Sequence, residues 1–171
     1  MEDVELLRSR VFRVVRRSDS IDGRPLPPRD VIEHPGAVAV LPVLDDGRIC
    51  LIRNYRIAVG RRLVEVPAGT LEPNEPPLAT AYRELTEETG YEAGHMEPLA
   101  QMLMSPGILH ERMHVFAATE LTPGDPHREP GEEIDNLLVS LDEALAMIER
   151  GEIEDAKTIA TLLLYDRRRP K

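Results

Sequence analysis

Residues 69–91 read GTLEPNEPPLATAYRELTEETGY, a stretch in which five glutamates and one arginine surround a predicted helix. The helix is expected over roughly 76–89, because its prolines stand in the opening turn and Gly90 is a natural stop. One face of this helix would carry Leu78, Tyr82, Leu85 and Thr89. Three glutamates lie on roughly the opposite face: Glu84, Glu87 and Glu88.

The spacing of these glutamates brings like charges together. Glu84 stands three residues before Glu87 and four before Glu88, so the three carboxylates converge on one helical surface. Arg83 can reach Glu87 one turn on, but it cannot neutralise the whole cluster. Hard divalent cations, Mg²⁺ or Mn²⁺, are natural partners of clustered carboxylate oxygens. The alternative for the glutamates taken alone is a solvated acidic helix face with local ion pairs.

The complete spacing is more specific than the glutamates alone. Gly69 is followed after five residues by Glu75, and after seven more by Arg-Glu-Leu-Thr-Glu-Glu-Thr-Gly at 83–90. This pattern resembles the Nudix box of the Nudix hydrolases without a gap. The one departure is the last position, where Tyr91 replaces the usual aliphatic residue.

The resemblance implies a fold, a reaction and a set of roles. The fold would be of the α/β (α+β) class, a Nudix-type α/β/α sandwich around a mixed sheet. The reaction would be hydrolysis of a nucleoside diphosphate linked to another group. Arg83 would orient the cluster, and Glu87 would serve in catalysis as well as in metal binding. The implied metal ligands are the Ala68 carbonyl, Glu84, Glu87 and Glu88.

The flanks of the box resemble the ADP-ribose pyrophosphatases. Glu65-Val-Pro-Ala-Gly69 matches their E-x-P-A-G run, and Ser105-Pro-Gly107 with Glu111 is similar to their stretch after the box. Arg53-Asn-Tyr-Arg56 resembles their Q-Y-R run, with asparagine in place of glutamine. The substrate-binding candidates are Arg53, Arg56, Glu65, Gly107 and Glu111.

These flanking candidates also have plainer interpretations. Arg53 and Arg56 can hold phosphate oxygens through the fork geometry of guanidinium, or they can be surface arginines. Glu111 can accept hydrogen bonds from ribose hydroxyls or bind metal, or it can be a carboxylate on the rim of the site.

A long stretch, 120–135, is rich in proline and glycine and predicts a loop. A loop of this length in a compact domain usually has a function or is disordered. Members of the resembled family bring a loop glutamate over the metals as general base, and a mobile loop suits that role. Glu133 is the first candidate and Glu132 the second, with Glu129 a further one. An acidic, solvated loop is the alternative.

Two segments divide the chain, an N-terminal β-rich segment over 1–33 and a Nudix domain over 34–171. Within the first, a strand over 29–33 is expected at a sheet edge, because prolines at 25, 27 and 28 precede it. Because relatives are homodimers whose N-terminal strands reach the neighbour, a homodimer is expected. The remaining predicted strands span 10–16, 37–43, 48–53, 62–66, 98–104, 111–118 and 137–139, and two further helices span 140–150 and 155–166.

Composition excludes other classes of function. The formal net charge of −10 argues against nonspecific binding to nucleic acid, which requires clustered Lys and Arg. The sequence has no apolar run near the roughly 20 residues of a membrane span. One cysteine, Cys50, cannot form an internal disulfide, which suits a reducing, cytoplasmic location. Most of the excess negative charge lies within 69–91 and 129–135, the predicted metal site and its loop.

The resemblance to the ADP-ribose pyrophosphatases implies a Mg²⁺-dependent or Mn²⁺-dependent hydrolase that converts ADP-ribose and water into AMP and ribose 5-phosphate. One alternative is another Nudix substrate, such as GDP-mannose, FAD or NADH. A second is a Nudix domain that binds a ligand without hydrolysing it.

Overall fold

Strand β6 (Ala37–Pro42) is the centre of the fold, and all six of its residues are buried. In this computed structural model, which describes residues 3–128 and 133–169, β6 pairs in parallel with β12 (Arg112–Pro123) and antiparallel with β9 (Ala68–Thr70). Strand β10 (Tyr91–Leu103) pairs antiparallel with β12 and completes a mixed sheet of order β10-β12-β6-β9. A continuously apolar strand such as β6 indicates a sheet covered on both faces.

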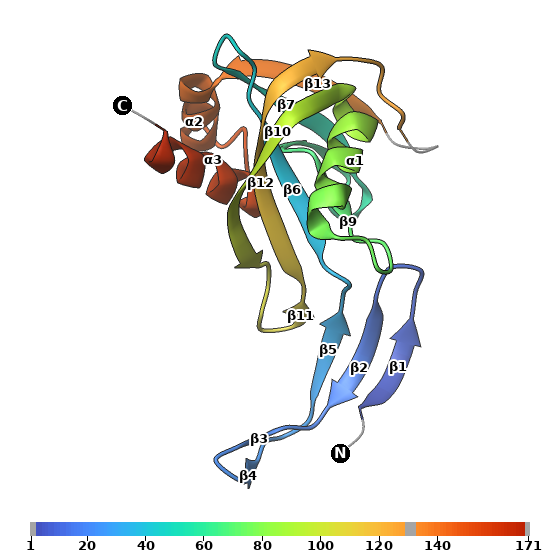
Figure 1. Cartoon of the computed structure of the whole chain (residues 1–171). Helices are drawn as coiled ribbons and strands as arrows, with labels where there is room; N and C mark the ends of the chain where they lie inside the picture. Colours follow the sequence, from blue (N-terminus) through green and yellow to red (C-terminus); the bar gives the residue numbers. More distant parts are fainter. Residues whose placement is uncertain (1–2, 129–132, 170–171) are drawn as a thin grey trace.

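The two faces of β6 belong to two apolar clusters, because side chains alternate along a strand. Ala39 and Leu41 pack in the cluster that contains residues of α2 (Leu141–Glu149) and α3 (Ala156–Arg168). Val38 and Val40 pack in the cluster that contains residues of α1 (Pro77–Thr89). Figure 1 shows α1 on one side of the sheets and α2 with α3 on the other. The predicted α/β/α sandwich around a mixed sheet is therefore confirmed.

A second sheet carries the strands that lead into the box. Its order is β13 (Ile134–Ser140), β7 (Arg48–Arg56) and β8 (Arg61–Glu65), and both pairings are antiparallel. A 3-10 turn, η1 (Ile57–Val59), joins β7 to β8. Only two residues, Val66 and Pro67, separate the end of β8 from β9, the strand that carries the first residue of the box, Gly69.

The N-terminal residues form a third sheet, which projects away from the rest of the molecule in Figure 1. Its strand order is β1 (Val4–Arg8), β2 (Arg13–Arg17), β5 (Arg29–Glu33) and β11 (Leu109–His110). A small hairpin, β3 (Ser20–Ile21) with β4 (Arg24–Pro25), extends from it. The proposed division between 1–33 and 34–171 stays a prediction.

The prediction that the strand at 29–33 forms an edge is wrong. Strand β5 lies between β2 and β11, and it pairs in parallel with β11 through Ile32 and Glu33. The prolines stand before β5 rather than within it, so they remove no hydrogen-bond donor from the strand. The parallel partner comes from the turn after β10, a contact that local sequence does not reveal.

Helix α1 is rotated relative to the face that its apolar residues suggest. Leu85 and Thr89 are buried, but Leu78 and Tyr82 are exposed, and Ala81 with Glu88 takes their place against the sheet. At 100° per residue this is a rotation of roughly 60° toward the glutamates. The rotation brings Glu88 against β9. None of the described helices is long and apolar enough to span a membrane.

Candidate active site

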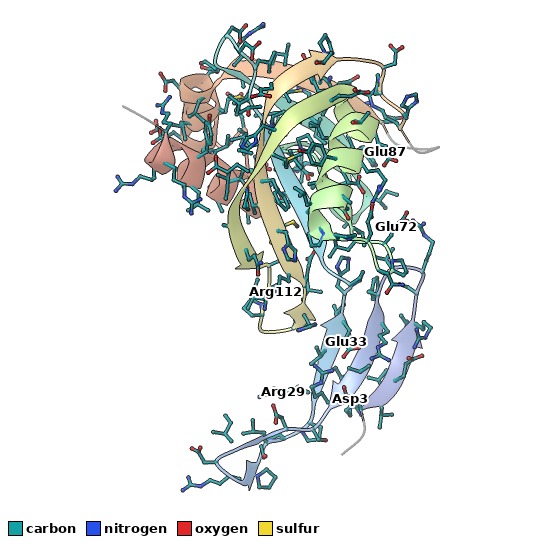
Figure 2. All side chains as sticks on the ribbon, viewed as in Figure 1. Asp3, Arg29, Glu33, Glu72, Glu87 and Arg112 are labelled. Carbon is teal, nitrogen blue, oxygen red and sulfur yellow. The ribbon has the colours of Figure 1, made fainter. Side chains whose placement is uncertain are left out.

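A cavity of about 850 Å³ brings the box together with the end of β7 and the N-terminal sheet. Helix α1 supplies its acidic wall, β9 supplies backbone beside that wall, and Arg56 comes from the end of β7. The turn between β1 and β2 contributes Arg10 and Val11. Figure 2 shows Glu87 on α1 and Glu72 on the loop after β9. The remaining lining residues are Pro35, Asn54, Ala68, Gly69, Thr70, Leu71, Pro73, Arg83, Glu84 and Glu88.

Gly69 has no room for a side chain. A Cβ built on it would lie 1.9 Å from Cδ and from Oε1 of Glu84. The Glu84 carboxylate therefore rests directly on the backbone of β9, which explains in physical terms why the box begins with glycine. This contact fixes the position of one predicted metal ligand.

Glu88 is joined to the same strand from the next turn of α1. The Ala68 N–H donates to Glu88 Oε2 at 2.9 Å, and Glu88 is only 4% exposed. A buried carboxylate is stable only when charge and hydrogen bonds compensate it. The hydrogen bond holds Glu88 next to Ala68, whose carbonyl is another predicted ligand.

Arg83 bridges three carboxylates. Its guanidinium donates to Glu75 at 3.0 and 3.1 Å, to Glu84 at 2.8 Å and to Glu87 at 2.9 Å. The hydrogen bonds that Arg83 donates to Glu75, together with the charge of Glu84 and the hydrogen bonds to Glu87 and Glu84, raise the pKa of Arg83 and outweigh burial. Arg83 is therefore a permanent cation paired with three carboxylates, and its predicted reach to Glu87 is present in the structure.

The donor set fits a hard divalent cation. Glu84, Glu87 and Glu88 line one cavity beside the backbone of Ala68, and carboxylate and carbonyl oxygens are the ligands that Mg²⁺ and Mn²⁺ prefer. Within the described ranges, no three acidic, His or Cys side chains already converge into a ligand cluster. Arg83 instead neutralises Glu84 and Glu87 by ion pairs, so the carboxylates would turn from it toward a metal.

The C-terminal end of α1 is capped by the segment that follows β12, a feature that the sequence did not reveal. The His127 N–H donates to the Glu87 carbonyl at 2.9 Å, and Arg128 Nε donates to the Glu88 carbonyl at 3.2 Å. Gly90 adopts φ 80° as the left-handed cap of the helix. The backbones of the two glutamates are thereby tied to the segment that leads into the predicted catalytic loop.

Arg56 lines the cavity and is held from behind by Glu65. Arg56 Nε and Nη2 donate to the two carboxylate oxygens of Glu65 at 2.8 and 2.7 Å. Burial by itself would raise the pKa of Glu65, but the Arg56 hydrogen bond and the charge of Lys157 prevail, so the pKa is lowered. The hydrogen bond that Arg56 donates to Glu65 raises the pKa of Arg56 despite its burial. Glu65 itself is 1% exposed and does not line the cavity.

Other predicted substrate-binding residues do not line this cavity. Arg53 is exposed on β7 and alternates with its buried neighbour Asn54, so it lies on the opposite face of the strand from Arg56. Gly107 lies in the turn between β10 and β11. Glu111 lies beside the N-terminal sheet, where its carboxylate is 3.7 Å from His34 Nδ1.

Of the three loop glutamates predicted as candidates for the general base, the structure describes only Glu133. Glu133 is exposed and pairs with Arg62 of β8, the Nη2–Oε2 distance being 2.8 Å. Its ion pair holds the carboxylate outside the cavity in this conformation. Glu132 and Glu129 lie outside the described residues.

Comparison with known proteins agrees with this architecture. A model of the NUDIX domain matches residues 33–162. The chain is 44% identical over 132 residues to an ADP-ribose pyrophosphatase of Bacillus subtilis, a match that covers 76% of this chain and 71% of that protein. It is 36% identical over 150 residues to a GDP-mannose pyrophosphatase of Citrobacter koseri, with 78% of each chain covered.

A crystal structure of an ADP compounds hydrolase shares the fold. Its TM-score is 0.80 at 22% identity, and the match covers 98% of this chain and 91% of that one. The chain belongs to the Nudix family. Within that family it is a pyrophosphohydrolase, similar to enzymes that act on nucleoside diphosphate sugars.

Proposed function

We propose that this Nudix pyrophosphohydrolase converts ADP-ribose and water into AMP and ribose 5-phosphate with Mg²⁺ or Mn²⁺. The observation that carries the proposal is that the box glutamates, Gly69 and Arg56 line the same cavity. The 44% identity to an ADP-ribose pyrophosphatase supports this choice of substrate. The E-x-P-A-G run has a structural role here, since its Glu65 holds Arg56 at the cavity.

The residues that line the cavity have different roles in the proposed hydrolysis. The Ala68 carbonyl with Glu84, Glu87 and Glu88 would hold the metal. Bound divalent cations neutralise pyrophosphate oxygens and lower the pKa of water, which makes hydrolysis of an anionic substrate feasible. In the metal-free arrangement Arg83 holds Glu84 and Glu87 in the cavity wall through its hydrogen bonds, until the two carboxylates turn toward a metal.

Arg56 and a loop glutamate complete this mechanism. Glu65 occupies the Nε and Nη2 atoms of Arg56, so we expect a phosphate oxygen to approach the Nη1 side of the guanidinium. That contact would bind the negative charge that the phosphate already carries in the substrate and keeps during attack. Glu133, or alternatively Glu132, would accept the proton of the attacking water after the loop closes over the cavity.

A panel of nucleoside diphosphate derivatives tests this substrate. ADP-ribose, GDP-mannose, FAD and NADH would each be incubated with enzyme and Mg²⁺, and the products identified by chromatography. We expect ADP-ribose to have the highest kcat/KM and to yield AMP with ribose 5-phosphate. A kcat/KM at least about tenfold higher for another compound would contradict the proposal.

GDP-mannose is the second candidate substrate, because one relative at 36% identity is a GDP-mannose pyrophosphatase. Both compounds present a pyrophosphate between a nucleoside and a sugar, so the box serves either. The same panel separates them.

We also propose a homodimer formed through the N-terminal sheet. All five residues of β1 are exposed, among them the apolar Val4, Leu6 and Leu7. An exposed apolar edge strand favours pairing with another chain. Light scattering after size-exclusion chromatography should give twice the 19.2 kDa chain mass, and Leu7→Glu should shift the protein toward monomer. A wild-type protein that elutes as monomer would contradict the dimer.

A further inference from the structure

Behind Arg56 lies a partly buried ion cluster that ends on the C-terminal helix, with Glu65 and Lys157 as its buried members. Glu65 accepts two hydrogen bonds from Arg56 and a third from Lys157 Nζ. Lys157 Nζ also donates to Asp155 Oδ2 at 3.0 Å. Lys157 is 7% exposed and does not line the cavity, so it has no access to a bound substrate.

The start of α3 is fixed against the same strand by a second contact. Asp155 caps the helix by accepting from the Thr158 N–H and the Thr158 hydroxyl, at 2.9 and 2.6 Å. The Thr158 hydroxyl oxygen in turn accepts from the Val66 N–H at 2.9 Å. Since Val66 adjoins Glu65, the first turn of α3 holds both the backbone and the carboxylate at the end of β8.

The charges in the cluster indicate how Lys157 affects the position of Arg56 and its positive potential. The cluster contains two carboxylates, Glu65 and Asp155, and two cations, Arg56 and Lys157. Because Glu65 and Lys157 are buried, their charges interact more strongly than they would in water. Without Lys157 the cluster would carry a net negative charge, and Arg56 would be the only remaining cation for both carboxylates. Its guanidinium would then be drawn toward Glu65 and would present less positive potential to the cavity.

We propose that Lys157 is a positioning residue for the pyrophosphate site, acting through Glu65 on Arg56 across the interface between α3 and β8. The inference rests on the proposed function in one respect, the assignment of Arg56 to a substrate phosphate. Lys157 holds one oxygen of Glu65 and shares its negative charge. Glu65 thus orients the Arg56 fork while leaving its positive charge directed at the substrate.

Steady-state kinetics of Lys157→Met tests this role, because methionine has a similar length but no charge. With ADP-ribose and saturating Mg²⁺, we expect KM to rise roughly tenfold while kcat stays within about threefold, the pattern for weakened ground-state binding. Lys157→Arg keeps the charge, and its KM should lie closer to that of the wild type. Arg61→Met is the matched control, since Arg61 is also on β8 but makes an exposed ion pair with Glu154. Its KM should not change.

A purely structural role for Lys157 predicts a different result. Loss of folded enzyme would lower the apparent kcat and the Tm while leaving KM unchanged, because KM does not depend on the fraction of active molecules. That result, measured together with circular dichroism, would overturn the inference. If Lys157→Met does not fold, Lys157→Gln removes the charge and keeps a hydrogen-bond donor, and the same KM criterion applies to it.

Arg56→Gln and the double variant separate this inference from the proposed function. We expect Arg56→Gln to raise KM, and Lys157→Met to add little in that background, because both changes act through the same guanidinium. An unchanged KM in Arg56→Gln would overturn the substrate role of Arg56. A raised KM in Arg56→Gln with an additive effect of Lys157→Met would leave the proposed function standing and overturn the positioning role.

Discussion

Gly69 and Glu84 are in direct contact, with the carboxylate of the helix residue seated where the glycine would otherwise carry a Cβ. The obstructing atoms are the end of a flexible side chain rather than backbone. An added methyl group at position 69 would therefore displace the carboxylate and leave β9 in place. This contact therefore predicts how a substitution at Gly69 changes the activity and the stability of the enzyme.

Gly69→Ala is expected to lower kcat/KM by about 100-fold with little loss of stability. A displacement of about 1 Å in a positioned group is enough for a loss of this size. The measurement is kcat/KM for ADP-ribose together with Tm. A fully active Gly69→Ala enzyme would show that the position of Glu84 does not matter for hydrolysis, whereas an unfolded variant would show that β9 itself cannot accept the methyl group.

Glu88→Gln should abolish most turnover and leave the fold intact. The amide is isosteric with the carboxylate but carries no charge to bind a cation. We expect activity to fall more than about 100-fold, because mutation of residues that only hydrogen-bond to metal ligands already lowers metal affinity or activity 10–100-fold. Stopped assays with ADP-ribose and Mg²⁺ measure this loss. Glu149→Gln is the matched control, because Glu149 is an exposed glutamate at the end of α2, and it should retain full activity. Equal activity in the two variants would exclude Glu88 from the site.

Sequence spacing predicted the elements of the box well, because its determinants are local. The proline-initiated helix, its end at Gly90 and the reach of Arg83 to Glu87 all depend on residues within a few turns. The continuous apolar run of β6 predicted a core strand for the same reason. These features need no knowledge of what packs against them.

Other features of the fold and the site depend on tertiary contacts, which residue spacing in the sequence does not reveal. The rotation of α1 that buries Glu88 depends on the shape of the sheet beneath it, and Leu78 with Tyr82 gives no sign of it. Lys157 stands 92 residues from its partner Glu65, so no local pattern links the two. Arg53 and Arg56 look equivalent in sequence, and only the pleat of β7 separates them, since Arg56 alone of the two lines the cavity.

Cys50 is expected to resist thiol reagents in the native enzyme. Its side chain is buried in β7, and burial raises the pKa of the thiol to about 12. Because a raised pKa disfavours the thiolate, less than about 0.1% of the native thiol is ionised at pH 8, far below the fraction in the unfolded chain. Titration with a chromogenic disulfide should give no reaction in buffer and one thiol per chain in urea. Rapid native reaction would contradict the burial.

Glu133 must leave Arg62 if it is to act as the general base. Glu133→Gln is expected to lower kcat by roughly 10²- to 10⁴-fold, the usual contribution of a positioned base. Arg62→Gln removes the ion pair that holds Glu133 away from the cavity, so its kcat should not fall. Rate measurements on both variants, with Glu132→Gln alongside, identify the base. If only Glu132→Gln loses activity, the second candidate replaces the first, and if neither does, the base lies outside this loop.

Removal of divalent cations should abolish activity and lower thermal stability together. Glu84 and Glu87 are held by Arg83 in the metal-free arrangement, so the protein should stay folded in a chelator, but a bound cation would add new interactions to the native state only. At ten times its Kd, Mg²⁺ would stabilise the fold by roughly 1.4 kcal/mol, or about 3–6 °C in Tm for a chain of this size. Differential scanning fluorimetry in EDTA and then in excess Mg²⁺ or Mn²⁺ measures the shift. Glu88→Gln should lose both the shift and the activity, whereas Glu149→Gln should keep both. A Tm that rises equally in all three proteins would place the cation elsewhere on the molecule.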